Sequence, residues 1–365
     1  MSSTALWFTI VWIALVAIIT DIIGAKKIVS NYGYEEVRYK TFPAILMFIP
    51  ALIYAATRNN FIDTEAYRFG FLNSQPTLEY IKQIILGDGK DKGFSILNAI
   101  IKFFIGNRDI VYFFIIALIS ITILIYVYKK YSCSYAISVF LFFASTDYLE
   151  WICNGMRQFL AVVVIFGCIG FILKKKYGRL ILVILAMSTI HQTALLMLPV
   201  IFIVQGKAWN KKTLFFIFAI LISIYFVNDF TTILEDMLAM TQYEDVVQQF
   251  AYDDGVNVLR VLVYAAPTII ALLFRRRLNE VSTPLSDLCT NMSILSTGIY
   301  ILAMFTSGIY VGRIPIYFSL YNYILLPWEI ENLFTPKSQR IVYILMIVLY
   351  LVFYYYQLSF SWGLI

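Results

Sequence analysis

Two side chains that can hold or transfer charge lie at or inside apolar stretches of this 365-residue sequence. Arg157 stands just before an apolar run over residues 159–173, and His191, the only histidine, lies within a second run over residues 180–204. Ionisable side chains are costly in lipid, so each of the two marks a candidate functional site. Arginine can hold an anion through its planar, permanently charged fork, and histidine can exchange a proton near neutral pH.

The composition places both residues in a membrane protein. Hydrophobic residues make up 61% of the chain and charged residues only 14%, against about 25% charge in a soluble domain. Apolar runs cover residues 5–23, 41–57, 109–128, 135–149, 155–173, 180–204, 213–229, 257–274, 290–310, 314–330 and 340–359. We therefore expect a single transmembrane domain over residues 1–365, an all-α polytopic fold of about 11–12 membrane helices. The first run has no basic segment before it and no cleavage site, which favours a retained helix.

Charge and cysteine content exclude two other classes of function. The net charge of +6 is spread over short loops, a pattern that fits membrane orientation and not a nucleic-acid partner. The four cysteines show no metal-ligand spacing, so we expect no metal site and no cofactor.

Basic clusters predict which loops face the cytoplasm. They lie at residues 26–40, 129–130, 174–179, 207–212, 275–277 and 337–340. The segment 230–256 carries acidic residues and no basic one, so we expect an extracytoplasmic loop there. The same rule places the loop 58–107 outside. Its amphipathic stretch, residues 94–105, could lie on the membrane interface and cover a site.

The run 180–204 conflicts with this assignment if it crosses the membrane once, because basic residues flank both of its ends. The conflict disappears if the chain enters and returns, with a turn near His191. Each arm of about 12 residues then spans roughly 18 Å, which is too short to cross alone. We predict a short hairpin or a broken helix pair, with His191 buried in protein or lining a wet cavity. One straight, tilted helix is the alternative.

This topology brings four groups of polar side chains to the outer face. Their members are Arg58, Asp63, Tyr67 and Arg68 after the second span, Asn154, Arg157 and Gln158 at the start of the fifth, His191 and Thr193 at the turn, and Arg313 and Tyr317 at a late helix. Spacings of three and four residues predict one helix face for the second group.

The chemistry of these groups suits a lipid-linked pyrophosphate. Arg157 lies roughly 5 Å inside the outer boundary, near the depth of a lipid phosphate. Arg157 and Arg313, with Arg58, would bind phosphate oxygens in pairs. His191 or Asp63 would take a proton as the catalytic base. The neighbouring amides and hydroxyls would position sugar or phosphate oxygens.

Each group also has a purely structural interpretation. Arg157 could pair with Glu150 or with a lipid headgroup, and His191 could be a hydrogen-bonded packing residue. Arg313 could extend to the interface from a helix end, and the tyrosines near it could form an aromatic belt. Asp63 could begin the helix that follows it.

Four islands of this pattern resemble the EpsG family of bacterial exopolysaccharide biosynthesis proteins, relatives of the Wzy-type polysaccharide polymerases. The islands are Arg58 with Asp63-Thr64 and Tyr67, Asn154-x-x-Arg157-Gln158, His191-Gln192-Thr193-Ala194, and Arg313-x-x-x-Tyr317-Phe318. Two positions depart from the family's pattern. The loop Asp91-Lys92-Gly93-Phe94 has no acidic residue directly before its glycine, and Gln192 stands where a small residue is usual.

The resemblance implies a polymerase of lipid-linked repeat units, similar to the GT-C class of integral-membrane glycosyltransferases. The donor would be the growing glycan on undecaprenyl pyrophosphate, and the acceptor an incoming lipid-linked repeat. A flippase and a chain-length regulator are candidate partners, and the site would face outward from the bacterial cytoplasmic membrane. The sequence has no Asp-x-Asp motif, which fits transfer without a metal. A flippase for the same lipid, a polysaccharide ligase and a membrane O-acyltransferase are the alternatives.

Overall fold

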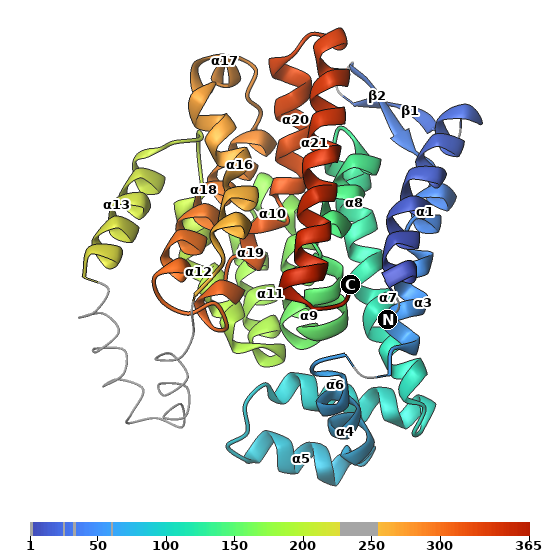
Figure 1. Ribbon diagram of the computed structural model, residues 1–365. Coiled ribbons are helices and arrows are strands. Elements are labelled where there is room, and N and C mark those ends of the chain that lie inside the picture. Colours follow the sequence, from blue (N-terminus) through green and yellow to red (C-terminus); the bar gives the residue numbers. More distant parts are fainter. Residues whose placement is uncertain (1–2, 25, 32–33, 60, 227–254) are drawn as a thin grey trace. The chain divides into compact units, whose positions relative to one another are not determined.

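The computed structural model describes residues 3–24, 26–31, 34–59, 61–226 and 255–365 (Figure 1). The chain divides into two compact units. Unit 1 comprises Met1–Leu198 and Thr335–Ile365, and unit 2 comprises Pro199–Phe334. Most of the predicted acidic loop, residues 230–254, lies outside the described residues. The expectation of a single transmembrane domain stays a prediction.

Unit 1 is almost entirely helical, with one short antiparallel hairpin near its start. Its elements are α1 (Ser3–Ile22), β1 (Lys26–Asn31), β2 (Tyr34–Tyr39), α2 (Thr41–Leu46), α3 (Ile49–Thr57), α4 (Thr64–Asn73), α5 (Leu78–Leu86), α6 (Lys92–Ile105), α7 (Asp109–Tyr131), α8 (Tyr135–Ala144), the π-helix η1 (Tyr148–Asn154), α9 (Met156–Gly167), α10 (Ile169–Leu173), α11 (Tyr177–Ile190), the 3₁₀-helix η2 (Gln192–Leu196), α21 (Pro336–Tyr356) and the π-helix η4 (Gln357–Ser361). Helix α12 (Met197–Ile203) contains the boundary between the units.

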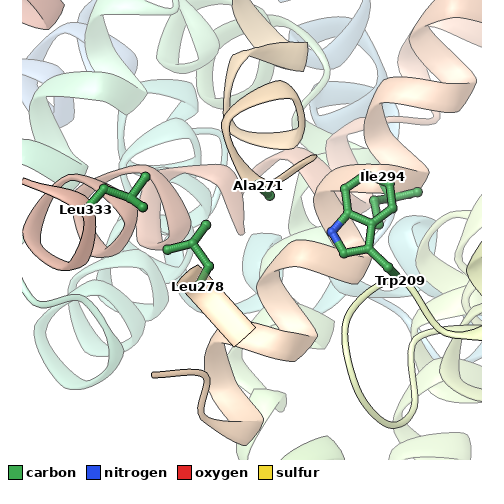
Figure 2. Close-up of a cluster of buried hydrophobic side chains, with 5 residues drawn as sticks. All are labelled: Trp209, Ala271, Leu278, Ile294 and Leu333. Atoms are coloured by element: carbon green, nitrogen blue, oxygen red, sulfur yellow. The ribbon is translucent and has the colours of Figure 1, made fainter. Parts of the chain in front are cut away.

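Unit 2 is helical throughout its described part. Its elements are α13 (Lys211–Tyr225), α16 (Val258–Leu273), α17 (Arg275–Glu280), α18 (Pro284–Met304), the 3₁₀-helix η3 (Val311–Arg313), α19 (Ile316–Ser319) and α20 (Asn322–Leu333). Figure 2 shows a cluster of buried side chains that α16, α17, α18 and α20 share with the loop before α13. Its members are Trp209, Ala271, Leu278, Ile294 and Leu333.

Four helical segments in the described residues are long and apolar enough to cross a membrane: Thr4–Ile22, Asp109–Tyr131, Met156–Leu173 and Pro336–Ser361. Large apolar side chains on the first and last of these are exposed, as expected where lipid and not protein surrounds a helix. The chain is therefore a multi-pass membrane protein.

The expected count of about 11–12 membrane helices is corrected to four or five, by length and composition, among the described residues. Every apolar run contains helix, but several runs break into short pieces. For example, Tyr135–Ala144 and Tyr148–Asn154 meet at a bend of 76° and form at most one further span. Thr146, with φ of 60°, lies at this break. Hydropathy counts apolar runs, whereas backbone turns inside a run decide whether one continuous helix forms.

The segment 58–107 forms three helices, α4, α5 and α6, which lie near the start of α7 (Figure 1). Phe71 of α4 stacks on Tyr112 of α7, with ring centroids 4.2 Å apart. Arg68 of α4 donates from Nε to Asp109, the first residue of α7, over 2.7 Å. These contacts fix the helices of the segment against a long membrane helix, so the residues they carry have a rigid support.

Candidate active site

One carboxylate, that of Asp91, joins Arg157 and His191. Its Oδ2 lies 3.2 Å from Nη1 of Arg157 and 3.3 Å from Nδ1 of His191. Its Oδ1 accepts the backbone N–H of Gln192 over 3.1 Å. The Asp91 side chain is 8% exposed, whereas that of Arg157 is 42% exposed. The carboxylate is therefore enclosed, and the arginine keeps N–H donors open to the surroundings.

The carboxylate reaches this position because of the way α6 begins. Asp91 is the residue before α6 and has a left-handed backbone, with φ of 51°, which aspartate tolerates better than most residues. Two residues later, a Cβ on Gly93 would lie 2.2 Å from Oγ1 and 2.9 Å from the backbone carbon of Thr189. Only glycine allows α6 to approach the end of α11 this closely, and that approach brings Asp91 to His191.

The histidine stands at a break between two helices. Helix α11 ends at Ile190, His191 itself is extended with φ of −152°, and η2 begins at Gln192. The break confirms the predicted interruption of the run 180–204 at this residue. An extended residue turns its side chain away from the helix path, and the backbone N–H of Gln192 at the start of η2 donates to Asp91 and not to a helix carbonyl. Whether the chain turns back within a membrane stays a prediction.

The arginine follows a second irregular segment. The π-helix η1 ends at Asn154, Gly155 separates the elements, and α9 starts at Met156. A Cβ on Gly155 would lie 2.9 Å from the Trp151 ring. Asn154 therefore lies outside the helix that carries Arg157, and the spacing argument for one shared helix face is wrong for Asn154. π-Helical turns are frequent at functional sites.

Asn154 instead connects the loop after α3 to this junction. Its Oδ1 accepts the backbone N–H of Asp63 over 3.2 Å. Arg58 makes a parallel link, because its Nη2 lies 2.7 Å from Sδ of Met156. Its Nε donates to Oγ1 of Thr64 over 3.2 Å. The first two predicted groups of polar residues thus lie together in unit 1.

Arg58 and Arg68 occupy more enclosed positions than Arg157. Arg58 is 4% exposed, and its guanidinium lies 4.2 Å from the centre of the Phe113 ring. Arg68 pairs with Glu65 and with Asp109. These contacts favour a positioning role for both arginines, and binding of substrate by either one stays a prediction.

The surroundings of Asp91 hold it ionised. Burial alone raises the pKa of the Asp91 carboxyl, but the His191 hydrogen bond, the Arg157 charge and the Gln192 N–H together outweigh burial, so the pKa lies below its ordinary value of 3.8. A carboxylate that accepts from Nδ1 of an imidazole selects the tautomer whose Nε2 is free to take a proton. The arrangement can therefore orient a base and hold an anion-binding cation with one group.

A comparison with family models identifies the protein. The model of the EpsG family matches residues 40–363, which is most of the chain. The chain belongs to the EpsG family. This family is a Wzy-like polysaccharide polymerase family, so the resemblance drawn from the sequence is confirmed. Neither a curated protein nor a solved structure matches the chain.

The remaining predicted residues of this EpsG-family chain fall into two places. Tyr67 of α4 makes an edge contact with Phe94 of α6, with ring centroids 6.1 Å apart. Gln158, buried in α9, and Thr193, half-buried in η2, follow Arg157 and His191 in their elements. These residues are part of unit 1.

Arg313, in η3, and Tyr317, buried in α19, belong to unit 2. Their participation in the site stays a prediction, as does the role of Asp63 as a base. Asp63 directly precedes α4 and is the residue before its first turn, although its side chain makes no capping hydrogen bond.

Asp91 is absent from the site residues predicted from the sequence. A signal for it exists, because the resemblance to the EpsG family leads us to expect an acidic residue directly before the glycine of this loop. In this chain the acidic residue stands two positions before Gly93, and its backbone is left-handed.

Proposed function

We propose that this EpsG-family protein polymerises lipid-linked oligosaccharide repeat units, with the Asp91–Arg157–His191 cluster as its reaction centre. The single observation that carries the proposal is the convergence of a cation and an imidazole, from two separate helical segments, on one buried carboxylate. A family of polymerases supplies the reaction class. The donor is a glycan on a polyprenyl pyrophosphate such as undecaprenyl pyrophosphate, and the acceptor is the hydroxyl of a second lipid-linked repeat.

The reaction is a direct displacement at the anomeric carbon of the donor. The acceptor oxygen forms the new glycosidic bond while the bond from the anomeric carbon to the pyrophosphate oxygen breaks. Nε2 of His191 takes the hydroxyl proton, and Asp91 stabilises the imidazolium that forms. Arg157 binds the pyrophosphate and offsets the negative charge that builds up as it leaves. Asp91 touches neither reacting atom and acts as a positioning residue for the other two.

Several finer features belong to the same proposal. Transfer requires no metal, because the guanidinium supplies the positive charge at the leaving group. The reaction takes place at the outer face of the bacterial cytoplasmic membrane, where the loop 58–107 lies by the distribution of basic residues. Gln158 and Thr193, which follow Arg157 and His191 in their elements, position substrate oxygens.

The test is a reaction with detergent-purified protein and a synthetic undecaprenyl-pyrophosphate-linked repeat in the presence of EDTA, with products separated as a ladder. The wild-type protein should extend the ladder. The His191→Ala variant should lose about 10²- to 10⁴-fold in rate, the usual contribution of a general base. The Arg157→Lys variant should lose about 10²-fold or more, because lysine lacks the paired fork.

Arg179→Lys is the matched control for Arg157→Lys. Arg179 is exposed in α11, and the variant makes the same replacement of a guanidinium by an ammonium away from Asp91. A wild-type ladder from His191→Ala would remove the base assignment and move it to Asp63. Translocation of the lipid-linked repeat across vesicles without any joining would replace the polymerase by a flippase.

A further inference from the structure

A cavity lined by cations and apolar side chains lies in unit 1, at the opposite end of α7 from Asp109. Its volume is about 420 Å³, within the range of roughly 300–1,000 Å³ that small-molecule sites occupy. The cavity is lined by Arg38, Thr41, Ile45, Thr122, Ile125, Tyr126, Lys129 and Lys130. Three of these residues are cations, and none of the described lining residues is acidic.

The cations come from segments that are far apart in the sequence. Arg38 lies in β2, whereas Lys129 and Lys130 lie in the last turn of α7. Lys129 donates to Oγ1 of Thr41 over 2.6 Å, and Lys130 donates to the Tyr126 hydroxyl over 2.8 Å. Both basic clusters are predicted from charge alone to face the cytoplasm. Tertiary structure places them on one cavity, where their charges add.

Helix α7 supplies two lysines to the wall of the cavity and an isoleucine one turn before them. Thr122, Ile125 and Lys129 recur at three- and four-residue spacing, so they form one stripe of the helix. From Lys129 to Thr122 the stripe rises by roughly 10 Å toward the middle of the helix. Ile45 of α2 faces the same cavity. A ligand that follows this wall needs an anionic end at the level of the cations and an apolar part at the level of the isoleucines.

We propose that this cavity binds the headgroup of an anionic phospholipid in the cytoplasmic leaflet. The phosphate lies among Arg38, Lys129 and Lys130, and an acyl chain runs along Ile125 and Ile45. Basic pockets beside membrane helices on the cytoplasmic side are suited to such headgroups. Helix α7 has 23 residues, roughly 34 Å of helix, so the cavity lies about one membrane thickness from the residue that Arg68 holds at the other end of α7. The lipid site is independent of the proposed polymerase activity.

The test measures thermal unfolding of the full-length protein in detergent while phosphatidylglycerol, phosphatidylcholine or inorganic phosphate is added. Phosphatidylglycerol should raise the unfolding temperature in a saturable way, and the other two should not. Removal of one cation, in Arg38→Ala or Lys129→Ala, should weaken the apparent affinity for phosphatidylglycerol about fivefold, and the double variant about 25-fold. Lys174→Ala is the matched control, because Lys174 is exposed, predicted to lie on the same side and outside the cavity.

Lys129→Ala also removes the hydrogen bond from Lys129 to Thr41, so a second variant that keeps this bond is needed. Thr122→Trp fills the apolar part of the cavity from an exposed position and removes no charge. It should abolish stabilisation by phosphatidylglycerol while the variant folds normally. Equal binding of phosphatidylglycerol by the wild type and the double variant would overturn the proposal. Equal stabilisation by inorganic phosphate would contradict binding of a lipid and would show that the cavity binds soluble phosphate.

Discussion

Oδ2 of Asp91 contacts both the guanidinium of Arg157 and the imidazole of His191. This single oxygen therefore affects how Arg157 can bind an anion and how His191 can take a proton. A diphosphate that approaches Arg157 meets a cation already partly neutralised by a carboxylate. The exposed N–H groups of Arg157 can bind the incoming anion while Nη1 stays on Asp91. Asp91 then keeps the imidazole in place throughout the reaction, which is the function of an orienting carboxylate.

Asp91→Asn is the most informative single change at this scale. Asparagine has the same size and tolerates the left-handed backbone, so the variant should reach the wild-type level in membranes. The rate of ladder extension should fall about 10- to 100-fold. The loss should fall on kcat and not on KM, because Asp91 orients the imidazole and touches neither substrate. A rate loss accompanied by a lower unfolding temperature would mean that Asp91 only supports the fold.

The elements that carry these side chains are interrupted where the side chains are needed. His191 separates α11 from η2, Gly155 separates η1 from α9, and Asp91 precedes α6 with a left-handed backbone. Each interruption leaves helix ends whose N–H groups or side chains point to neighbours and not along the helix. Breaks in apolar segments are tolerated only where protein or a wet cavity surrounds them, and the breaks at His191 and Gly155 both occur at the candidate site.

Gly93→Ala tests the contact between two such elements. The new Cβ would clash with the backbone of Thr189, which cannot rotate away. Helix α6 should move from α11 and carry Asp91 away from His191. We expect a loss of about 1–3 kcal/mol of stability, typical of overpacking, together with loss of ladder extension. Thermal unfolding and the polymerisation assay measure the two effects.

Gly89→Ala is the matched control in the same loop, because a Cβ at Gly89 would meet no atom within 4 Å. Equal stability and activity of the two variants would show that the close approach of α6 to α11 does not position Asp91.

For the whole molecule, orientation in the membrane decides which molecules the Asp91 cluster and the basic cavity can meet. The candidate site includes Asp91 of the loop 58–107, and the basic cavity lies at the far end of α7. Because α7 is long enough to cross, the two should face opposite sides of the bilayer. The substrate would then bind near the outer end of α7, and the phospholipid would bind near its cytoplasmic end.

Labelling of intact cells with a membrane-impermeant maleimide checks this orientation. Cys133 is exposed just after α7 and should stay unlabelled until the membrane is permeabilised. The Asp88→Cys variant should be labelled in intact cells, since Asp88 is exposed in the loop that the basic residues predict to lie outside. Removal of Cys133 by Cys133→Ser provides the background. Labelling of Cys133 before permeabilisation would reverse the topology and place the Asp91 cluster in the cytoplasm.

The sequence by itself determined the membrane class, the family and the position of the break at His191, and it marked Arg157 as a candidate site residue. These follow from local properties, because hydropathy, charge and short motifs are read along one stretch of chain. Only the tertiary structure decided that Asp91 joins the two residues, that Asn154 lies outside the helix of Arg157, and that fewer helices are long enough to cross. Contacts across 66 and 100 residues, as between Asp91 and its two partners, depend on how α6, α9 and α11 pack. That packing rests on a left-handed residue and a close approach at one glycine, neither of which has a periodic signal in the sequence.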